Sequence, residues 1–323
     1  MLLSDAGTSI LAKNLKKKPE PSGPFSLVRI VEPYPFTYSF KVKESNISIS
    51  ISRLFYIRFP FRTEEDWAKR VELGYIKVNG ETVSPDFVVK VQDQISHYSP
   101  SVREPSVPDN VKVLFEGNGF IVVDKPAPMP VHAGGRYHKN TLIAILSEQG
   151  YAPLHVVHRL DAVTSGLMIL ATTKEKAGEL TQNFQTSGIT KVYHALVKGL
   201  PDWEEIKCDL PVRRDKGFRF TTSDGSGAKP ALTEFRCLHR GKTGSIIECK
   251  PVTGRTHQIR VHLKALGYPI ANDFVYLNDS KVTTLQNRPI FLQQSVLGLP
   301  TERNNFEIPI PDDWFRILDD EAD

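Results

Sequence analysis

The sequence holds 323 residues, of which 40% are hydrophobic and 24% are charged, and its formal net charge is +4. This composition is that of an ordinary globular protein of two or three domains. No apolar run approaches the roughly 18–20 residues of a membrane span, so no membrane partner is expected, and the mild positive charge permits an anionic partner without demanding one.

The N-terminal stretch and the cysteines bear on the compartment. Residues 1–27 read as a flexible leader without the apolar core of a secretory signal, and Asp5 and the lack of arginine argue against an organelle transit peptide. Cys208, Cys237 and Cys249 form neither a CxxC pair nor a disulfide framework, which favours a reducing compartment. We therefore expect a cytoplasmic protein, with an organelle as the alternative location. A monomer is expected separately from these observations.

Residues 28–105 are expected to form a small N-terminal domain. Thr63 with Asp66 three residues later predicts the start of a helix, and Gly74 is placed to end it. The alternating stretch YIKVNGETV then predicts a hairpin that turns at 79–80, an Asn-Gly pair.

This helix and hairpin, with Lys69 and Arg70 late in the helix, resemble the S4 RNA-binding fold. The resemblance implies that Lys69, Arg70 and Lys77 contact RNA phosphates. The alternative is an ordinary helix and hairpin whose lysines are simply solvated. The proline-rich stretch SPSVREPSVP, residues 99–108, predicts a linker between this domain and the larger one.

Residues 106–323 are expected to form the larger domain. Strands and helices mix there without a strict βαβ rhythm, which predicts an α+β fold with a large mixed, mostly antiparallel sheet flanked by helices. Four apolar runs are predicted as strands: FIVVD (120–124), GLMILA (166–171), VYHALVKG (192–199) and SIIECKPV (245–252).

Two helices are predicted among these strands. Thr172 and Glu175 form a capping-box pair at the head of the first, which Gly188 ends. The second helix lies within 256–267, and its predicted buried stripe consists of Ile259, Leu263 and Leu266.

A charged cluster precedes the run GLMILA, where His158, Arg159 and Asp161 crowd together. They could form a structural ion pair, or Asp161 could be a catalytic carboxylate on a loop held by a rigid scaffold. We interpret His158 as a structural hydrogen-bonding histidine. No cysteine or further clustered histidine supports a zinc site at His155 and His158, so no metal is expected.

Four stretches, in chain order, resemble the RluA family of RNA pseudouridine synthases between about residues 111 and 310. The N-terminal stretch VRIVEPYPFTYSFKVK and the S4-like region are similar to eukaryotic-type members that act on tRNA. The resemblance implies the pseudouridine synthase fold and an enzyme that detaches a uracil, rotates it and rejoins it through C5, without metal or cofactor. The stretches are DKPAPMPVHAGG (124–135), HRLDAVTSGLMILA (158–171), KVYHALVKG (191–199) and PVTGRTHQIRVHLKALGYPIAND (251–273).

The resemblance assigns the nucleophile to Asp161, the active-site tyrosine to Tyr193 and its arginine to Arg260. The reaction needs a single carboxylate, whereas glycoside hydrolysis needs two, and the core motif offers only Asp161. A paired arginine would keep that carboxylate ionised. Tyr193 can stack on a pyrimidine, but a phenol is a poor base at neutral pH, so direct proton abstraction stays open.

The expected substrate-binding residues surround this set. Arg159 matches the residue thought to fill the gap left by a flipped base, a role that suits a planar guanidinium. Arg255 and Arg260 lie five apart and would point about 140° from each other on an ideal helix, so Arg255 is expected to contact backbone or phosphate instead of Asp161. His257 and Lys191 complete the predicted set.

Three further stretches either bear on RNA binding or depart from the family pattern. The basic loop RRDKGFR (213–219) is predicted to face RNA, with a solvated loop as the alternative. The chain has Asn272 before Asp273 where the family usually has Gly-Asp, and Gln293 where it often has histidine. These departures affect the expected local packing and substrate fit, not the reaction.

Three functions compete. The intact set of Asp161, Tyr193 and Arg260 favours an active RNA pseudouridine synthase, with tRNA as the first candidate substrate and rRNA as the next. The alternative is a catalytically idle RNA-binding or RNA-folding protein on the same scaffold. A bifunctional enzyme with a deaminase would need an HxE…PCxxC zinc signature, which the sequence lacks.

Overall fold

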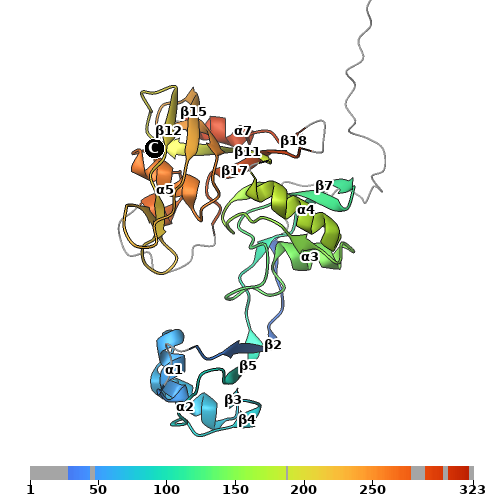
Figure 1. Cartoon of the computed structure of the whole chain (residues 1–323), viewed down its shortest axis with the longest axis vertical. Helices are drawn as coiled ribbons and strands as arrows, with labels where there is room; N and C mark the ends of the chain where they lie inside the picture. Colours follow the sequence, from blue (N-terminus) through green and yellow to red (C-terminus); the bar gives the residue numbers. More distant parts are fainter. Residues whose placement is uncertain (1–27, 44–47, 187, 278–287, 301–304, 320–323) are drawn as a thin grey trace, which may run out of the picture.

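The computed structural model describes residues 28–43, 48–186, 188–277, 288–300 and 305–319. The predicted leader, residues 1–27, lies outside these residues. Two bodies are visible in Figure 1: an N-terminal module of residues 34–102, and a large domain from which the module extends on β2 and β5.

The N-terminal module is a four-stranded antiparallel sheet, ordered β2-β5-β3-β4, covered by two helices. Its helix α2 begins as predicted, because Thr63 and Asp66 form a capping box, and positive φ angles at Asn79 and Gly80 make the predicted tight hairpin. Trp67 and Phe55 fill its core. The elements are β2 (Tyr34–Lys41), α1 (Ile51–Arg58), α2 (Glu64–Glu72), β3 (Ile76–Val78), β4 (Glu81–Thr82) and β5 (Gln94–Val102).

The proline-rich stretch between the two bodies differs from the predicted linker. Its first residues belong to β5, and β6 (Val107–Pro108) pairs with β1 (Val28–Arg29). Between them, the Glu104 carboxylate accepts hydrogen bonds from the backbone N–H groups of residues 138–140 at 2.8–3.2 Å. Proline has no backbone N–H, but the other residues of this stretch keep theirs and can pair. Residues 99–108 therefore form an ordered connection, the joint between the two bodies, and not a flexible linker.

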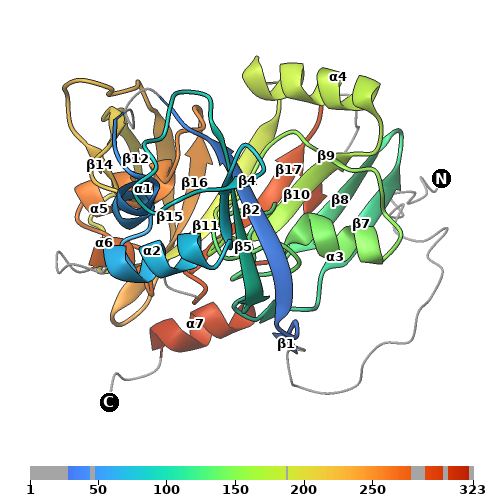
Figure 2. The ribbon, with the colours of Figure 1, turned by 90° about the horizontal axis from the view of Figure 1, so that it is seen from below.

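The large domain is built on one mixed sheet, seen in Figure 2, with the order β12-β15-β16-β11-β17-β10-β8-β7. β18 pairs with β17 and β9 with β10; only the β10–β17 pair is parallel, so the predicted mostly antiparallel sheet is confirmed among the described residues. The strands are β7 (Lys112–Gly117), β8 (Phe120–Lys125), β9 (His155–Val156), β10 (Ser165–Ala171), β11 (Thr190–Lys198), β12 (Glu205–Cys208), β15 (Thr233–Arg240), β16 (Gly244–Pro251), β17 (Leu292–Gly298) and β18 (Phe306–Glu307).

Helices cover both faces of this sheet, which explains why its central strands read as continuous apolar runs. On β8, Val123 faces α3 while Val122 faces α4; on β11, Ala195 faces α5 while Leu196 faces α7. The remaining elements are α3 (Leu142–Glu148), α4 (Lys174–Gln185), the hairpin strands β13 (Val212–Arg214) and β14 (Phe220–Thr222), α5 (Gln258–Ala265), α6 (Phe274–Leu277) and α7 (Asp312–Asp319).

Two helix starts differ from the predictions. The N-cap of α4 is Thr173, which accepts the N–H of Lys176 at 3.2 Å, so the predicted Thr172 pair is one residue early. Helix α5 begins at Gln258 instead of residue 256, and residues 258–263 are all buried rather than one stripe of them. The first turns of α5 pack between the sheet and the β13–β14 hairpin, so they have no face toward solvent. The spacing of apolar residues, which predicts a single buried stripe, is therefore a poor guide to burial in this helix.

Gly166 allows the parallel pairing that joins the two halves of the sheet. Its φ is +110°, and a Cβ there would lie 2.3 Å from the carbonyl oxygen of Gln294 on β17. No other residue tolerates this approach, so Gly166 of the TSG sequence is required where β10 meets β17. This line of contact between the two halves of the sheet is called the seam below. Tyr193 packs against the cores on both sides of that seam.

Candidate active site

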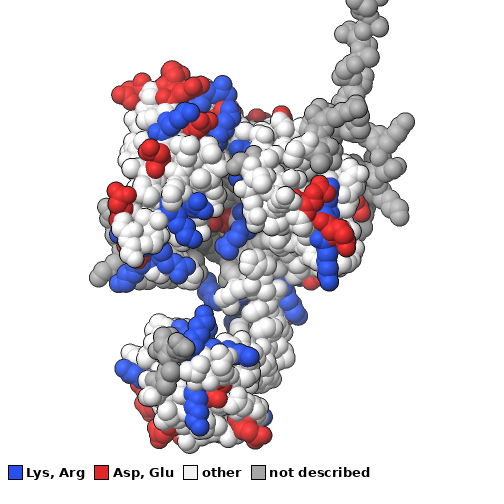
Figure 3. All heavy atoms as spheres, viewed as in Figure 1, with Lys and Arg blue, Asp and Glu red and all other residues white. Residues whose placement is uncertain are grey.

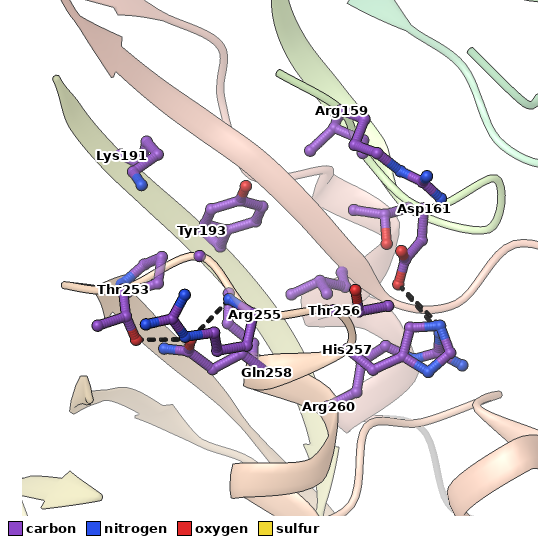
Figure 4. Close-up of a pocket in the computed structure, with 16 residues that line it drawn as sticks. Arg159, Asp161, Lys191, Tyr193, Thr253, Arg255, Thr256, His257, Gln258 and Arg260 are labelled. Carbon is purple, nitrogen blue, oxygen red and sulfur yellow. Dashed lines mark hydrogen bonds and ion pairs between the residues drawn. The ribbon is translucent and has the colours of Figure 1, made fainter. Parts of the chain in front are cut away.

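A pocket of about 200 Å³ opens at the seam between the two halves of the large domain (Figure 4). All seven large-domain residues predicted from the sequence line it, whereas Lys69 and Arg70 lie in the N-terminal module. The predicted residues at the pocket are Asp161, Tyr193, Arg260, Arg159, Arg255, His257 and Lys191. The fold therefore gathers stretches that are about a hundred residues apart in the sequence.

Arg260 joins two carboxylates. Its Nε and Nη2 donate to the two oxygens of Asp273 at 2.7 and 2.8 Å, and its Nη1 donates to Oδ2 of Asp161 at 3.0 Å. Arg260 is 4% exposed and Asp273 is 1% exposed, so the guanidinium is fixed in its plane. Asp273 was not predicted as a site residue, although it ends the PIAND stretch in which the chain departs from the family.

The electrostatics keep Asp161 ionised. Burial raises the pKa of its carboxyl, but the charge that His257 gains in acid and the permanent charges of Arg260 and Arg159 together lower that pKa by more. Burial also lowers the pKa of His257 to about 4, so the ring is neutral at neutral pH. The two arginines therefore supply the positive charge that stabilises the carboxylate at neutral pH.

His257 stands directly beside this carboxylate. It is the N-cap of α5, with a left-handed φ of 58° that is uncommon for a residue other than glycine. Its Nε2 lies 3.5 Å from Oδ2 of Asp161, and its Nδ1 lies 2.7 Å from the hydroxyl of Tyr276. Sequence reasoning placed His257 at the substrate and missed Tyr276, because a single tyrosine after the motif carries no local signal.

The loop before α5 is pinned by Gln258, which is 4% exposed. Its Oε1 accepts from the Thr253 hydroxyl at 2.7 Å and from the Arg255 backbone N–H at 2.9 Å. The Nε of Arg255 donates to the Pro230 carbonyl at 2.9 Å. Because Arg255 precedes the helix, the 140° argument does not apply to it.

Tyr193 and Lys191 project from β11 on the opposite side of the pocket from Asp161 (Figure 4). Burial, with a contribution from Asp161, raises the pKa of the Tyr193 phenol above its usual value, so the hydroxyl keeps its proton. Burial lowers the pKa of the Lys191 ammonium. Arg159 lies exposed at the rim above Asp161.

A buried lysine stands behind the loop that carries Asp161. The Nζ of Lys125 is 2.9 Å from the Met129 carbonyl and 3.4 Å from the Ala162 carbonyl, and burial lowers the pKa of this ammonium to about 7. The Met129 N–H also donates to Ala162, at 2.8 Å. Lys125 lies in the stretch DKPAPMPVHAGG but was not predicted as a site residue, because its partners are backbone carbonyls that a sequence motif does not identify.

The two departures from the family pattern have structural explanations. Asn272 has a φ of 62°, a left-handed conformation that asparagine tolerates better than most residues, so it can stand where the family has glycine. Gln293 is buried, and its Nε2 donates to the Pro309 carbonyl at 2.8 Å.

His158 is the structural histidine expected, because its Nε2 accepts the Ile169 N–H at 3.0 Å.

The predicted basic loop RRDKGFR forms the tip of the β13–β14 hairpin, beside α5. Phe218 at this tip is 69% exposed, and the Arg214 guanidinium lies 5.8 Å from the Phe220 ring. Figure 3 shows Lys and Arg gathered on both sides of the hollow between the large domain and the N-terminal module.

Metal clusters and membrane-spanning helices are both absent from the described residues. Across residues 28–319 without the gaps given above, no three His, Cys, Asp or Glu side chains come close enough to hold a metal ion. In the same part of the chain, no helix has the length and apolarity needed to cross a membrane.

Comparison with known proteins identifies the family. Residues 119–265 match the family described as RNA pseudouridylate synthase. The mitochondrial tRNA pseudouridine(32) synthase of Saccharomyces cerevisiae is 37% identical over 78% of this chain and 55% of its own length. The uncharacterized RNA pseudouridine synthase YlyB of Bacillus subtilis is 30% identical over 81% of this chain and 92% of its own.

A solved structure extends the likeness to the fold. Human RNA Pseudouridylate Synthase Domain Containing 1 is 28% identical, with a TM-score of 0.55 over 67% of this chain and 89% of the human one. The chain spans 55–66% of the length of the first curated relatives it matches. With YlyB matched over nearly its whole length, the chain belongs to the RluA-type family of RNA pseudouridylate synthases.

Proposed function

We propose that the protein is an RNA pseudouridine synthase that isomerises uridines in structured RNA, with tRNA as the first candidate and rRNA as the next. The observation that carries this is the ionised Asp161, fixed by Arg260 at 3.0 Å and facing Tyr193 across a small pocket. The name of the yeast relative, a tRNA pseudouridine(32) synthase, supports tRNA. A catalytically idle RNA-binding protein is disfavoured, because it would not need this carboxylate held ionised.

The reaction assigns one role to the carboxylate. The fixing contacts with Arg260 and His257 both involve Oδ2 of Asp161, so we assign Oδ1 to act at C1′ of the uridine. The C1′–N1 bond breaks and the uracil leaves with its electron pair. The uracil turns, a C1′–C5 bond forms, and the proton lost from C5 is matched by one gained at N1.

The other pocket residues bind and orient the RNA. Tyr193 stacks on the pyrimidine and, keeping its proton, positions C5 instead of abstracting from it. Arg159, exposed at the rim, fills the place of the flipped base. Lys191 and Arg255 contact the RNA backbone. The scheme uses no metal and no cofactor.

We further propose that the N-terminal module is S4-like and binds RNA phosphates. Its support is a helix followed by a tight hairpin, with cations on the surface. Lys77 is exposed on β3, and the Arg70 guanidinium lies 5.3 Å from the Tyr75 ring. Lys69 is held less freely, since it pairs with Glu65 at 3.4 Å.

The compartment and the oligomeric state complete the proposal. We propose a monomer in a reducing compartment, with the cytoplasm before an organelle. Buried free thiols at Cys208, Cys237 and Cys249 support the reducing environment. Fractionation of cells and light scattering of the purified protein test these two points.

Tritium release from RNA labelled at C5 of uridine tests the activity. The full chain should release tritium from tRNA transcripts, and chemical mapping of pseudouridine should lose specific sites when the gene is removed. Tight RNA binding without tritium release from any transcript, and with no lost sites, would favour the idle RNA-binding protein. Release from rRNA transcripts alone would change the substrate but not the reaction.

A further inference from the structure

Tyr276 contacts both side chains that hold Asp161. It lies on α6 behind the pocket and is 3% exposed. Its hydroxyl is 2.7 Å from Nδ1 of His257, and its ring lies beneath the Arg260 guanidinium at 5.0 Å. Tyr276 thus touches the same two residues that touch Asp161, so it is placed to orient both of them.

The hydrogen bonds define the direction of this contact. The Tyr276 hydroxyl accepts the backbone N–H of Phe220 at 3.1 Å. The phenol then has its own hydrogen to donate, and His257 Nδ1 is the acceptor within reach. With the phenol as the donor, the proton of the neutral His257 ring sits on Nε2, the nitrogen that lies 3.5 Å from Oδ2 of Asp161.

The backbone of His257 indicates that this orientation matters. A left-handed φ carries a conformational cost at residues other than glycine and persists where the surroundings fix it. The surroundings here are the Tyr276 hydroxyl and the Phe220 ring, whose centroid is 5.2 Å from that of His257. The cost is consistent with a ring that must face Asp161.

The chain of contacts leads outward to the basic hairpin. Phe220 is the first residue of β14, and the hairpin tip carries Arg214, Lys216 and the exposed Phe218. Arg213 at its base donates to Ser223 at 2.6 Å, which keeps the two strands together. A ligand that orders the tip would therefore also order the Phe220 N–H.

We propose that Tyr276 is a positioning residue that links the β13–β14 hairpin to the Asp161 carboxylate through His257 and Arg260. RNA phosphates bound at the hairpin tip fix Phe220, Phe220 fixes the Tyr276 hydroxyl, and the hydroxyl fixes the two partners of Asp161. This inference rests on the proposed function, because it concerns the same carboxylate and the same RNA.

Removal of one hydroxyl tests the link. In Tyr276→Phe the single-turnover rate constant on a responsive RNA should fall about tenfold, a barrier increase of about 1.4 kcal/mol, while the Kd for that RNA changes less than twofold. Tyr268→Phe is the matched control, because Tyr268 packs edge-on against Trp203, outside the residues that line the pocket, and should keep the wild-type rate.

A double-mutant cycle separates positioning from general support of the fold. His257→Ala should slow turnover about tenfold, and adding Tyr276→Phe to it should cost less than a further twofold, because the hydroxyl acts through His257. His257→Gln, which restores an N–H near Asp161, should recover most of the rate. If Tyr276→Phe does not fold, the comparison of His257→Gln with His257→Ala carries the test.

The outcomes are distinguishable from those of the proposed function. A wild-type protein inactive on every RNA would overturn the proposed function itself. An active wild type with an unchanged rate in Tyr276→Phe, rate losses that multiply in the double variant, or equal losses in His257→Gln and His257→Ala would each overturn the link alone. A changed Kd with an unchanged rate would make Tyr276 a support for RNA binding and would also overturn it.

Discussion

The charges of the pocket and those of the N-terminal module are held in opposite ways. In the pocket, Arg260 makes three hydrogen bonds to two aspartates and is almost fully buried. In the module, Lys77 is exposed on β3, and the side chain of Lys69 is 65% exposed. The first arrangement fixes a charge in place, and the second leaves charge available.

This difference matches two physical demands. Stabilising a developing charge at C1′ needs a carboxylate whose partners are already oriented, because reorganisation during the reaction would raise the barrier. Binding RNA phosphates needs mobile cations that exchange counterions, and it tolerates imprecise geometry. The pocket should therefore be sensitive to single atoms, whereas the module should respond only to the number of its charges.

The most severe way to break the pocket is Asp161→Asn. The amide keeps the shape but has no negative charge with which to act at C1′, so turnover should be abolished. Tritium release measures turnover, and filter binding should show RNA affinity close to that of the wild type, because the module is untouched. Activity above about a hundredth of wild type, a loss of only about 2.7 kcal/mol, would remove Asp161 as the essential carboxylate.

Asp273→Asn should be the next most harmful change. It leaves the buried Arg260 without a full counter-charge, and breaking such a pair costs about 3 kcal/mol of the free energy of unfolding. Urea titration measures this, and turnover should fall as Arg260 loses its orientation.

A matched change in the module provides the contrast for Asp273→Asn. Glu65→Gln breaks the Lys69–Glu65 pair, whose side chains are 65% and 81% exposed, and stability should hardly change. Equal destabilisation by Asp273→Asn and Glu65→Gln would contradict the distinction between fixed and available charge.

The two regions also differ in how far the sequence predicts them. The module's helix and hairpin follow from the local signals at Thr63 and Asn79, and the strands of the large domain follow from apolar runs covered on both faces. The parallel β10–β17 pairing was not predictable, because Gly166 meets Gln294 only through the folded seam. The resemblance of four stretches to a known family identified Asp161 and its neighbours, which the fold brings to one pocket.

The supporting residues behind the pocket were missed for a related reason. Tyr276 contacts His257, which lies 19 residues earlier, and Lys125 contacts backbone carbonyls, so neither contact carries a periodic or spacing signal. Helix α5 also begins later than predicted, because His257 has a left-handed φ. The stretch GRTHQIR contains no signal for that backbone conformation. The family resemblance indicated the side chains that line the pocket, but not the contacts that orient them.

The large domain and the N-terminal module each contain a buried histidine that stays neutral in the folded protein. At low pH both histidines should lower the free energy of unfolding. Burial lowers the pKa of His158 to about 3 and that of His97 in the module to about 4. An unfolded histidine titrates near 6.5, so below that pH the unfolded state binds a proton that the folded state refuses, and stability falls as the pH drops toward 3. Each histidine contributes up to about 1.4 kcal/mol per pH unit.

Substitution separates the two contributions. In His158→Gln the side-chain oxygen still accepts the Ile169 N–H, and the slope of unfolding free energy against pH between 6 and 4.5 should decrease by up to that amount. Denaturant titration at a series of pH values measures it, with the exposed His132→Gln as control. An unchanged slope would show that His158 is protonated in the folded protein.

The smallest expected effect concerns the charges of the module. Lys69→Gln, Arg70→Gln and Lys77→Gln together should weaken RNA binding only a few-fold at moderate salt, and each lost phosphate contact should reduce the slope of log affinity against log salt by about 0.7–0.9. These substitutions test the module better than truncation at Val111 does, because truncation also removes Glu104 and the buried Val107, which belong to the joint and the core.

The triple variant should keep its single-turnover rate at saturating RNA, because the Asp161 pocket is intact. If affinity and salt slope both equal those of the wild type, the module binds no phosphate. It is then a structural or partner-docking element, and only the large domain contacts RNA.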